Sequence, residues 1–403
     1  MWEQIRSNQI KSAMLVALMG VLLLLLGYFL GLLFGSGIAG IIIALIVWGI
    51  MNLVAFFQGD SILLGISGAR KISPDDHPRL YNVVEEMKIA SGLERMPDVY
   101  IIDDPALNAF STGRDPNRAS VAITSGLLQK LNRDELQGVI SHEVAHIKNR
   151  DVLLMVLLSV LLGSIVILAW YASRFMFLSG AGGGRSRSSS GGGGGAQLII
   201  IIVGVVLMIL APIAAQLIYF AVSRKREYLA DASSALYTRY PEGLASALEK
   251  LATSDTSVRT ANKATAPMYI INPFQKKGIS IESLTSTHPP IAERIRILRA
   301  MAGASLADYE QSYRQARGGG GIIPASAVAG AGTMALRAPS PETKPVEEFP
   351  QKVERARETS DLMWRLSNYK TISCECGITL RIPPNFRAPA VRCPHCGRVN
   401  RIL

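Results

Sequence analysis

Two histidines one helical turn apart are the residues whose spacing most clearly supports chemistry. His142 and His146 stand four positions apart in the segment HEVAH. Side chains at positions i and i+4 of a helix lie on one face, so both imidazoles can bind one Zn²⁺. Glu143, beside the first histidine, is then placed to take a proton from water at the metal. The spacing therefore predicts a catalytic zinc site with Glu143 as its general base.

The residues around HEVAH predict the helix that must carry it. Asn132 is followed three positions later by Glu135, the signature of a capping box at a helix start. Between residues 139 and 147, only side chains of the motif itself can ionise, as a buried active-site helix requires. An uncharged apolar run begins at residue 152, so we expect the helix to continue directly into a membrane.

A third ligand is expected from Glu227, which follows the last apolar run and a basic cluster. If residues 152–172 and 198–222 form a membrane hairpin, Glu227 returns to the face that the two histidines occupy. Two imidazoles, one carboxylate and a water make a catalytic zinc site. Asp231, one turn further on, could accept a hydrogen bond from a ligand imidazole. The alternative is that both carboxylates only solvate a helix end beside basic residues.

The composition indicates a membrane protein. Hydrophobic residues make up 49% of the chain, a high share for a soluble protein. Four uncharged runs are long enough to cross a bilayer core of about 30 Å as helices: residues 13–34, 38–57, 152–172 and 198–222. The net charge of +11 is attributed to basic flanks of these runs rather than to nucleic-acid binding. The positive-inside rule favours both termini and the catalytic domain in the cytoplasm, although Arg174, Arg185 and Arg187 lie on the other side.

Residues 58–151 have the composition of a globular domain. Strands are predicted over 98–103 and 119–124, and a helix over 78–91 that ends at Gly92. Strand, strand and HExxH helix in this order is the arrangement of zincin proteases, in which an edge strand pairs with extended substrate. The alternative for 119–124 is an ordinary core strand.

The four cysteines are confined to the C-terminal end. Cys374, Cys376, Cys393 and Cys396 form two knuckles, each followed by glycine, which predicts a zinc ribbon with one structural Zn²⁺ and a reducing compartment. His395 could replace one cysteine, but the set of four is already complete. The net charge of the ribbon is compatible with lipid headgroups, a protein partner or nucleic acid.

These features predict a mainly α integral membrane protein with a zincin α+β metalloprotease domain and a small zinc-ribbon domain. A stretch rich in Gly, Ala and Pro predicts a flexible linker between the two domains, where an endopeptidase could cut itself. The predicted boundaries are 1–57 for an N-terminal membrane hairpin, 58–303 for the protease domain interrupted by the hairpin 152–222, 304–360 for the linker and 361–403 for the ribbon.

Four motifs together resemble the HtpX family of membrane zinc metalloproteases, relatives of the CAAX prenyl endopeptidases. They are LNAFSTG, HEVAH, REYLADA and STHPPIAERI, within roughly residues 1–303. The resemblance implies a zinc endopeptidase of a bacterial or archaeal plasma (inner) membrane, with its active site facing the cytoplasm and a role in quality control.

Carried onto this chain, the resemblance implies the site residues. His142, His146 and Glu227 are the expected zinc ligands and Glu143 the general base. Asn108 and Phe110 are expected in the substrate-binding edge segment. His288, in the last of the four motifs, is a candidate donor to the reaction oxyanion.

Two rival functions have other partners. A CAAX-type prenyl-protein endopeptidase would need more spans than the four predicted, to enclose a chamber. A non-proteolytic, membrane-tethered protein would bind through the ribbon, but few aromatic residues and no sustained basic patch lie there. The expected partners are unfolded or damaged membrane proteins and membrane lipid, with a regulatory protein at the ribbon as a further candidate and nucleic acid not expected.

Overall fold

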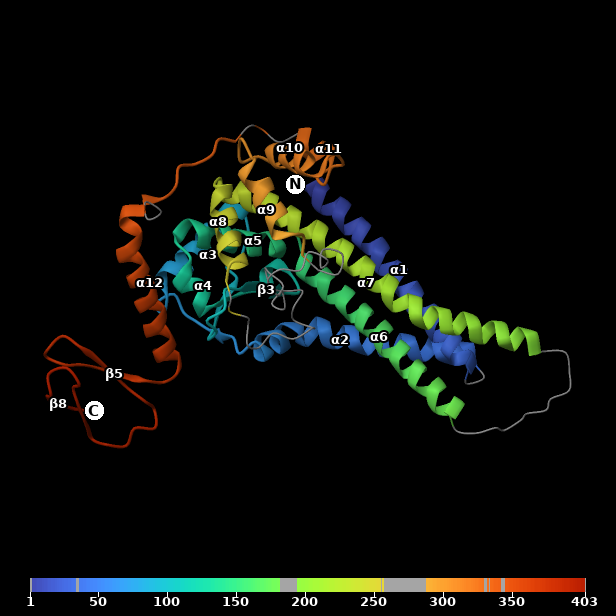
Figure 1. Ribbon diagram of the computed structural model, residues 1–403, viewed down its shortest axis with the longest axis horizontal. Coiled ribbons are helices and arrows are strands. Elements are labelled where there is room, and N and C mark those ends of the chain that lie inside the picture. The colour runs from blue at the N-terminus through green and yellow to red at the C-terminus, as the bar shows by residue number, and fades with distance from the viewer. Residues whose placement is uncertain are drawn as a thin grey trace.

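The long helices of the molecule extend to one side of a globular part, and a small C-terminal unit lies at the other side (Figure 1). These coordinates are a computed structural model. The structure describes residues 2–33, 36–181, 194–254, 256, 288–329, 332, 334–341 and 345–402.

The membrane part is built from four helices: α1 (Trp2–Leu33), α2 (Gly37–Ile66), α6 (Asp151–Ala181) and α7 (Gly194–Thr238). Buried apolar side chains inside this helix bundle form a core of their own, whereas the C-terminal part of α7, from Tyr228, belongs to the core of the globular part. Among the described residues, three helices are long and apolar enough to cross a membrane, in the windows Gly37–Val54, Asp151–Tyr171 and Val205–Thr238. The first predicted span is represented by a shorter apolar stretch of α1, Val16–Leu32.

The globular domain contains one four-stranded sheet in the order β1-β2-β4-β3. Its strands are β1 (Arg70–Lys71), β2 (Asp98–Ile102), β3 (Ala109–Gly113) and β4 (Ala119–Thr124). β2 runs parallel to β4, whereas β3 pairs antiparallel with β4 and forms one edge. The strands predicted over 98–103 and 119–124 are present, but β4 lies between β2 and β3, so 119–124 is the core strand of the alternative and not the edge strand. A 3-10 turn (Pro116–Arg118) joins β3 to β4.

Helices pack on the sheet and on one another through their apolar faces. They are α3 (Pro78–Ser91), α4 (Ser125–Lys130), α5 (Arg133–Lys148) and α8 (Pro241–Ala252). Gly92 ends α3 in the left-handed conformation, with φ of 68°, as predicted. The capping box of α5 is present in full, since Asn132 and Glu135 each accept a hydrogen bond from the other's backbone N–H. The helix that carries HEVAH therefore begins where the sequence predicts.

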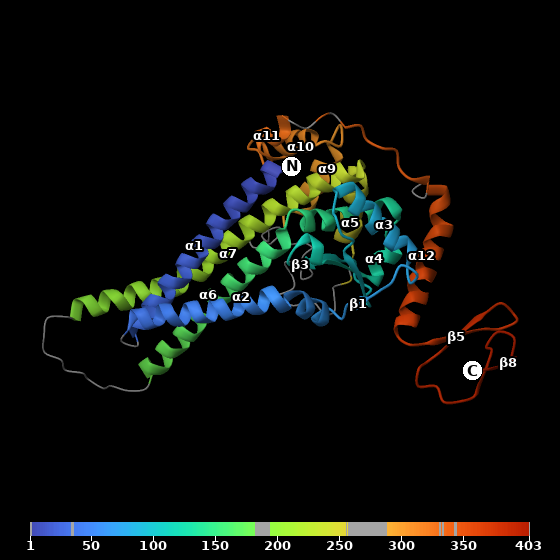
Figure 2. The same cartoon turned by 180° about the vertical axis from the view of Figure 1, so that it is seen from behind.

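The prediction that this helix continues into the membrane is wrong. α5 ends at Lys148, with Asn149 as its C-cap, and Arg150 has a positive φ of 58°. A separate helix, α6, begins at Asp151. The left-handed residue turns the chain between the two helices. Figure 2 shows α5 and α6 pointing in different directions.

The prediction of a flexible linker over residues 304–360 is also wrong. The chain after His288 forms α9 (Ile291–Arg299), α10 (Leu306–Arg317), α11 (Ala325–Ala329) and α12 (Pro345–Leu366). Tyr309 of α10, Ile322 and Ile323 are buried in the core of the globular domain. Arg337 ion-pairs with Asp134 at 2.6 Å. Buried contacts with the domain order this segment despite its composition.

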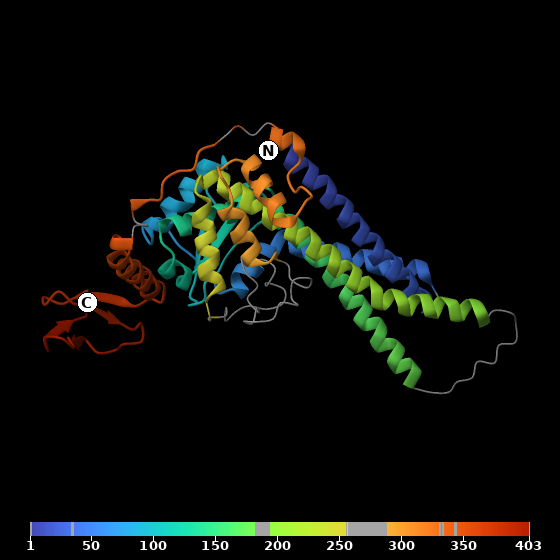
Figure 3. The ribbon, with the colours of Figure 1, turned by 45° about the horizontal axis from the view of Figure 1, so that its top comes forward.

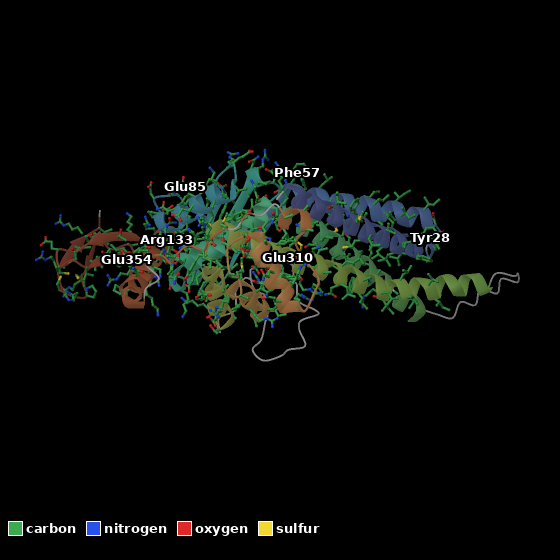
Figure 4. The ribbon with its side chains drawn as sticks, turned by 90° about the horizontal axis from the view of Figure 1, so that it is seen from above. Tyr28, Phe57, Glu85, Arg133, Glu310 and Glu354 are labelled. Atoms are coloured by element: carbon green, nitrogen blue, oxygen red, sulfur yellow. The ribbon has the colours of Figure 1, made fainter. Side chains whose placement is uncertain are left out.

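The C-terminal unit consists of two short antiparallel ladders. β5 (Lys370–Ser373) pairs with β6 (Thr379–Ile382), and β7 (Ala390–Arg392) pairs with β8 (Val399–Arg401). Each pair carries one cysteine knuckle. Figure 4 shows this unit beyond Glu354 of α12, at the opposite end of the molecule from Tyr28 of α1.

Candidate active site

The three predicted zinc ligands meet in the structure. His142 and His146 project from α5 toward Glu227 of α7, and their ligand atoms all lie within 4.8 Å of one another. The two histidine Nε2 atoms are 3.2 Å apart. Glu227 lies 3.6 Å from Nε2 of His142 and 3.4 Å from Nε2 of His146. The hairpin of α6 and α7 therefore returns the carboxylate to the histidines.

These distances fit a zinc ion. Tetrahedral bonds of about 2.0–2.2 Å to nitrogen and oxygen put the ligand atoms roughly 3.3–3.6 Å apart. Two imidazoles and one carboxylate are the donor set of a catalytic zinc site, in which a fourth position stays open for water. The triad has both the chemistry and the spacing for this metal.

A carboxylate orients each ligand imidazole from behind. Nδ1 of His142 lies 3.0 Å from Oδ1 of Asp231. Nδ1–H of His146 donates to Asp151 at 2.9 Å. Burial by itself lowers the pKa of His142, but the carboxylates of Asp231 and Glu227 beside its ring outweigh burial and raise that pKa overall. Both rings thus present Nε2 to the centre.

Asp151 was missed by the sequence analysis as a site residue. In the sequence it marks only the polar edge of an apolar run, five positions after His146. The turn at Arg150 brings it back against the imidazole. That turn was not predicted, so neither was the contact.

Arg294 is the second residue that the sequence analysis missed. It lies on α9, is fully buried, and contacts Glu227 at 3.0 Å and Asp231 at 2.7 Å. The guanidinium thus balances the charge of two buried carboxylates. One signal in the sequence could have indicated its burial: Arg294 lies on the same face of the predicted helix as the apolar residues of STHPPIAERI. That signal was weak, because a charged residue in the first turn of a helix usually faces solvent.

Glu143 and His288 are the two further residues expected at this centre. Glu143 is buried on α5, directly after the first ligand. Nδ1 of His288 lies 3.2 Å from Glu227. His288 therefore contacts a ligand, and its role as an oxyanion donor stays a prediction.

The expected substrate-binding residues lie at the edge strand. Asn108 directly precedes β3 and is buried. Phe110 packs against Leu63 and Leu64 of α2, whereas its neighbour Ala109 belongs to the core that includes α5. The Phe110 side chain thus lies on the sheet face away from the metal ligands, which leaves the backbone of β3 for contact with substrate.

The four cysteines also meet. The Sγ atoms of Cys374 and Cys396 are 3.6 Å apart, and those of Cys376 and Cys393 are 3.7 Å apart. Zn–S bonds of about 2.3 Å give tetrahedral S–S separations of roughly 3.8 Å. The backbone N–H of Cys376 hydrogen-bonds the Cys374 thiol and lowers its pKa to about 6. The cluster therefore fits a metal, and the cysteines are free thiols rather than disulfides.

Comparison with known proteins agrees with this geometry. Residues 74–302 match peptidase family M48. The chain is 45% identical over 300 residues to a protease HtpX homolog of Dictyoglomus turgidum, which covers 74% of this chain and 94% of that protein. It is 44% identical over 302 residues to a protease HtpX homolog of Streptococcus pneumoniae, which covers 75% of this chain and 100% of that protein.

A solved structure, the crystal structure of S. mikatae Ste24p, is 21% identical and covers 74% of this chain and 67% of that chain. Its TM-score of 0.42 is too low to support a conclusion about this fold. The match to the family and the similarity to the two HtpX homologs establish the family without this structure. The chain belongs to peptidase family M48, and it is a membrane zinc metalloendopeptidase of the HtpX type.

Proposed function

We propose that this metalloprotease hydrolyses misfolded or damaged membrane proteins at the cytoplasmic face of the plasma (inner) membrane, a quality-control role. One observation carries the proposal. Glu227 lies on α7 just after the apolar run that ends at Val222, and His146 is hydrogen-bonded to Asp151, the first residue of α6. The metal ligands therefore lie where the membrane hairpin joins the domain. Figure 3 shows the long helices of this hairpin leaving the globular part. Segments that leave the bilayer would reach this site first.

The edge strand β3 supports a preference for unfolded chain. A substrate that adds to a sheet edge must be extended, because main-chain hydrogen bonds provide the binding. β3 is an edge strand of the sheet and packs against α5. A folded domain cannot offer such a segment, whereas a damaged membrane protein can.

The residues divide the chemistry of peptide hydrolysis among them. Bound zinc would act as a Lewis acid and lower the pKa of a water ligand to about 7. Glu143 takes the proton of the attacking water and returns it to the leaving amine. Asp231 keeps the His142 ring in its ligating orientation, and Arg294 holds Glu227 and Asp231 in place. His288 is the candidate donor to the developing oxyanion.

The orientation in the membrane is part of the proposal. Basic residues flank the apolar runs on the side of the catalytic domain, at Arg70, Lys71, Lys148 and Arg150. The start of α1 lies beside α10 and α11, so this end of the chain shares the side of the domain (Figure 1). Both termini and the active site are thus assigned to the cytoplasm.

A second, structural zinc is proposed for the four-cysteine cluster. The ribbon lies beyond α12, away from the far ends of the membrane helices (Figure 4). That position favours a soluble protein partner over lipid headgroups, and we assign the ribbon a regulatory partner.

The test uses the purified full-length chain in proteoliposomes with a membrane protein and a destabilised variant of it. We expect cleavage of the destabilised variant, and a rate lower by about 10²–10⁴-fold in Glu143→Gln, which keeps its zinc. Equal cleavage of the stable and destabilised forms would overturn the quality-control role. Cleavage that required a prenyl group on the substrate would favour the CAAX-type activity instead.

A further inference from the structure

Asp151 lies between the zinc ligands and the membrane hairpin. We propose that it is a positioning residue that couples the geometry of the metal centre to the packing of α6 against α7. The inference rests on the proposed function, because it concerns the same zinc site. It assigns a role to Asp151 and to its contact with Arg226, neither of which takes part in the hydrolysis itself.

The two carboxylate oxygens of Asp151 have different partners. Oδ2 accepts a hydrogen bond from Nδ1 of His146 at 2.9 Å. Oδ1 accepts a hydrogen bond from the guanidinium of Arg226. Asp151 and Arg226 are 4% and 6% exposed, so this contact is shielded from water. One side chain thus joins a metal ligand of α5 to a residue of α7.

The places of these residues in the chain make the contact a link between elements. Asp151 is the first residue of α6, directly after the left-handed turn at Arg150. Arg226 directly precedes the ligand Glu227 on α7. If α6 shifted along α7, Asp151, which accepts the hydrogen bond from His146, would therefore move relative to the carboxylate of Glu227.

The chemistry explains why both partners are needed. A carboxylate behind a ligating histidine selects the ring orientation and raises the basicity of the nitrogen that binds the metal. A buried carboxylate without a cation is strongly destabilising, and Arg226 provides that cation. Asp231 does the same for His142 with Arg294 as its cation. The site therefore repeats one arrangement for both imidazoles, once inside the domain and once at the membrane hairpin.

The test measures zinc affinity in the full-length chain with Cys393→Ser and Cys396→Ser, so that only the catalytic centre binds zinc. Zinc is titrated against a chelator in detergent, without any substrate. We expect Asp151→Ala to weaken zinc binding by about 10–100-fold, and Asp151→Asn, which keeps an acceptor for His146, to weaken it less. With Co²⁺ in place of zinc, Asp151→Ala should shift the visible absorption bands of the metal.

Asp134→Asn is the matched control. Asp134 is also a buried carboxylate near a helix start, paired with Arg337 at 2.6 Å, but it lies at the far end of α5 from His146. We expect its zinc affinity within about twofold of the parent chain, since it has no contact with a ligand.

Two results would overturn the proposal: unchanged zinc affinity and cobalt spectrum in Asp151→Ala, or an equal loss in Asp134→Asn. If Asp151→Ala does not fold, the isosteric Asp151→Asn still decides, because parent-like affinity and spectrum in that variant would contradict a role for the charge. The readout does not depend on cleavage, so failure of the quality-control role would leave it interpretable.

Discussion

The two metal-binding clusters of this protein are built in opposite ways. The catalytic cluster draws its ligands from two long helices, α5 and α7, and lies within a large core. The ribbon cluster draws its ligands from two short ladders, and its small buried cluster contains Cys374, Leu380 and Cys393, with Ile378 and Val391 packed against it. The same ion would therefore have different structural importance at the two sites.

The difference concerns what holds the ligands without a metal. At the catalytic centre, Arg294, Asp231 and Asp151 already orient the ligands and balance their charge. In the described part of the ribbon, the thiols lie mainly against one another. We infer that the protein organises the catalytic site and that the metal organises the ribbon.

The largest expected effect is on the ribbon. Cys393→Ser, or chelation of zinc, should unfold residues 370–402, because metal binding contributes about 10–16 kcal/mol to folds of this size. Hydrogen exchange should show loss of protection in β5–β8 and continued protection of α5. If the β5–β8 amides stayed protected after chelation, the inference that the metal organises the ribbon would be wrong.

The next effect is at Arg294. Arg294→Met leaves Glu227 and Asp231 as buried carboxylates without their cation, which should cost about 3–5 kcal/mol of unfolding free energy. The loss should be smaller with zinc bound, because the ion compensates Glu227. Denaturant unfolding with and without zinc measures both values, and equal losses in the two states would argue against this role.

A pH effect should separate the two regions further. Burial, together with the nearby Arg79, lowers the pKa of His77 from about 6.5 to about 4, and its Nδ1 caps α3 by accepting from Leu80. The unfolded chain then binds a proton that the folded domain does not, so stability is full above pH 6.5 and falls as the pH decreases toward 4.

The loss from His77 should reach about 3 kcal/mol, at 1.36 kcal/mol for each pH unit. His77→Asn keeps a cap but cannot titrate, and its protease domain should lose less stability on acidification. Thermal unfolding of the parent chain and of His77→Asn between pH 7 and 4 provides the measurement. The same acid sensitivity in both would exclude His77 as its source.

The smallest effect should be at the start of α5. Asn132→Ala removes the cap of the helix that carries the ligands and should cost about 1 kcal/mol. Zinc affinity should stay close to that of the parent chain, because α5 is anchored along its length by the core. A chelator titration with an unfolding curve tests both, and a large loss of zinc would mean that the protein holds this site less firmly than we infer.

Local residue patterns determined much of this protein by themselves. The capping box at Asn132 and the left-handed Gly92 depend on interactions within a few positions, and the two strands are marked by their runs of β-branched and apolar residues, so the sequence was sufficient to predict all of them. The spacing of HEVAH and of the cysteine knuckles likewise determines which side chains can share an ion. The orientation of the protein in the membrane and the role of the ribbon are still predictions.

Only the tertiary structure decided the contacts made across the chain. Asp151 and Arg294 look like solvated charges in the sequence, and only the turn at Arg150 and the packing of α9 bring them to the ligands. The segment over residues 304–360 looks like a linker because its order comes from burial against a distant core. Composition and periodicity describe a residue's neighbours along the chain, whereas the pairing of a buried charge depends on neighbours in space.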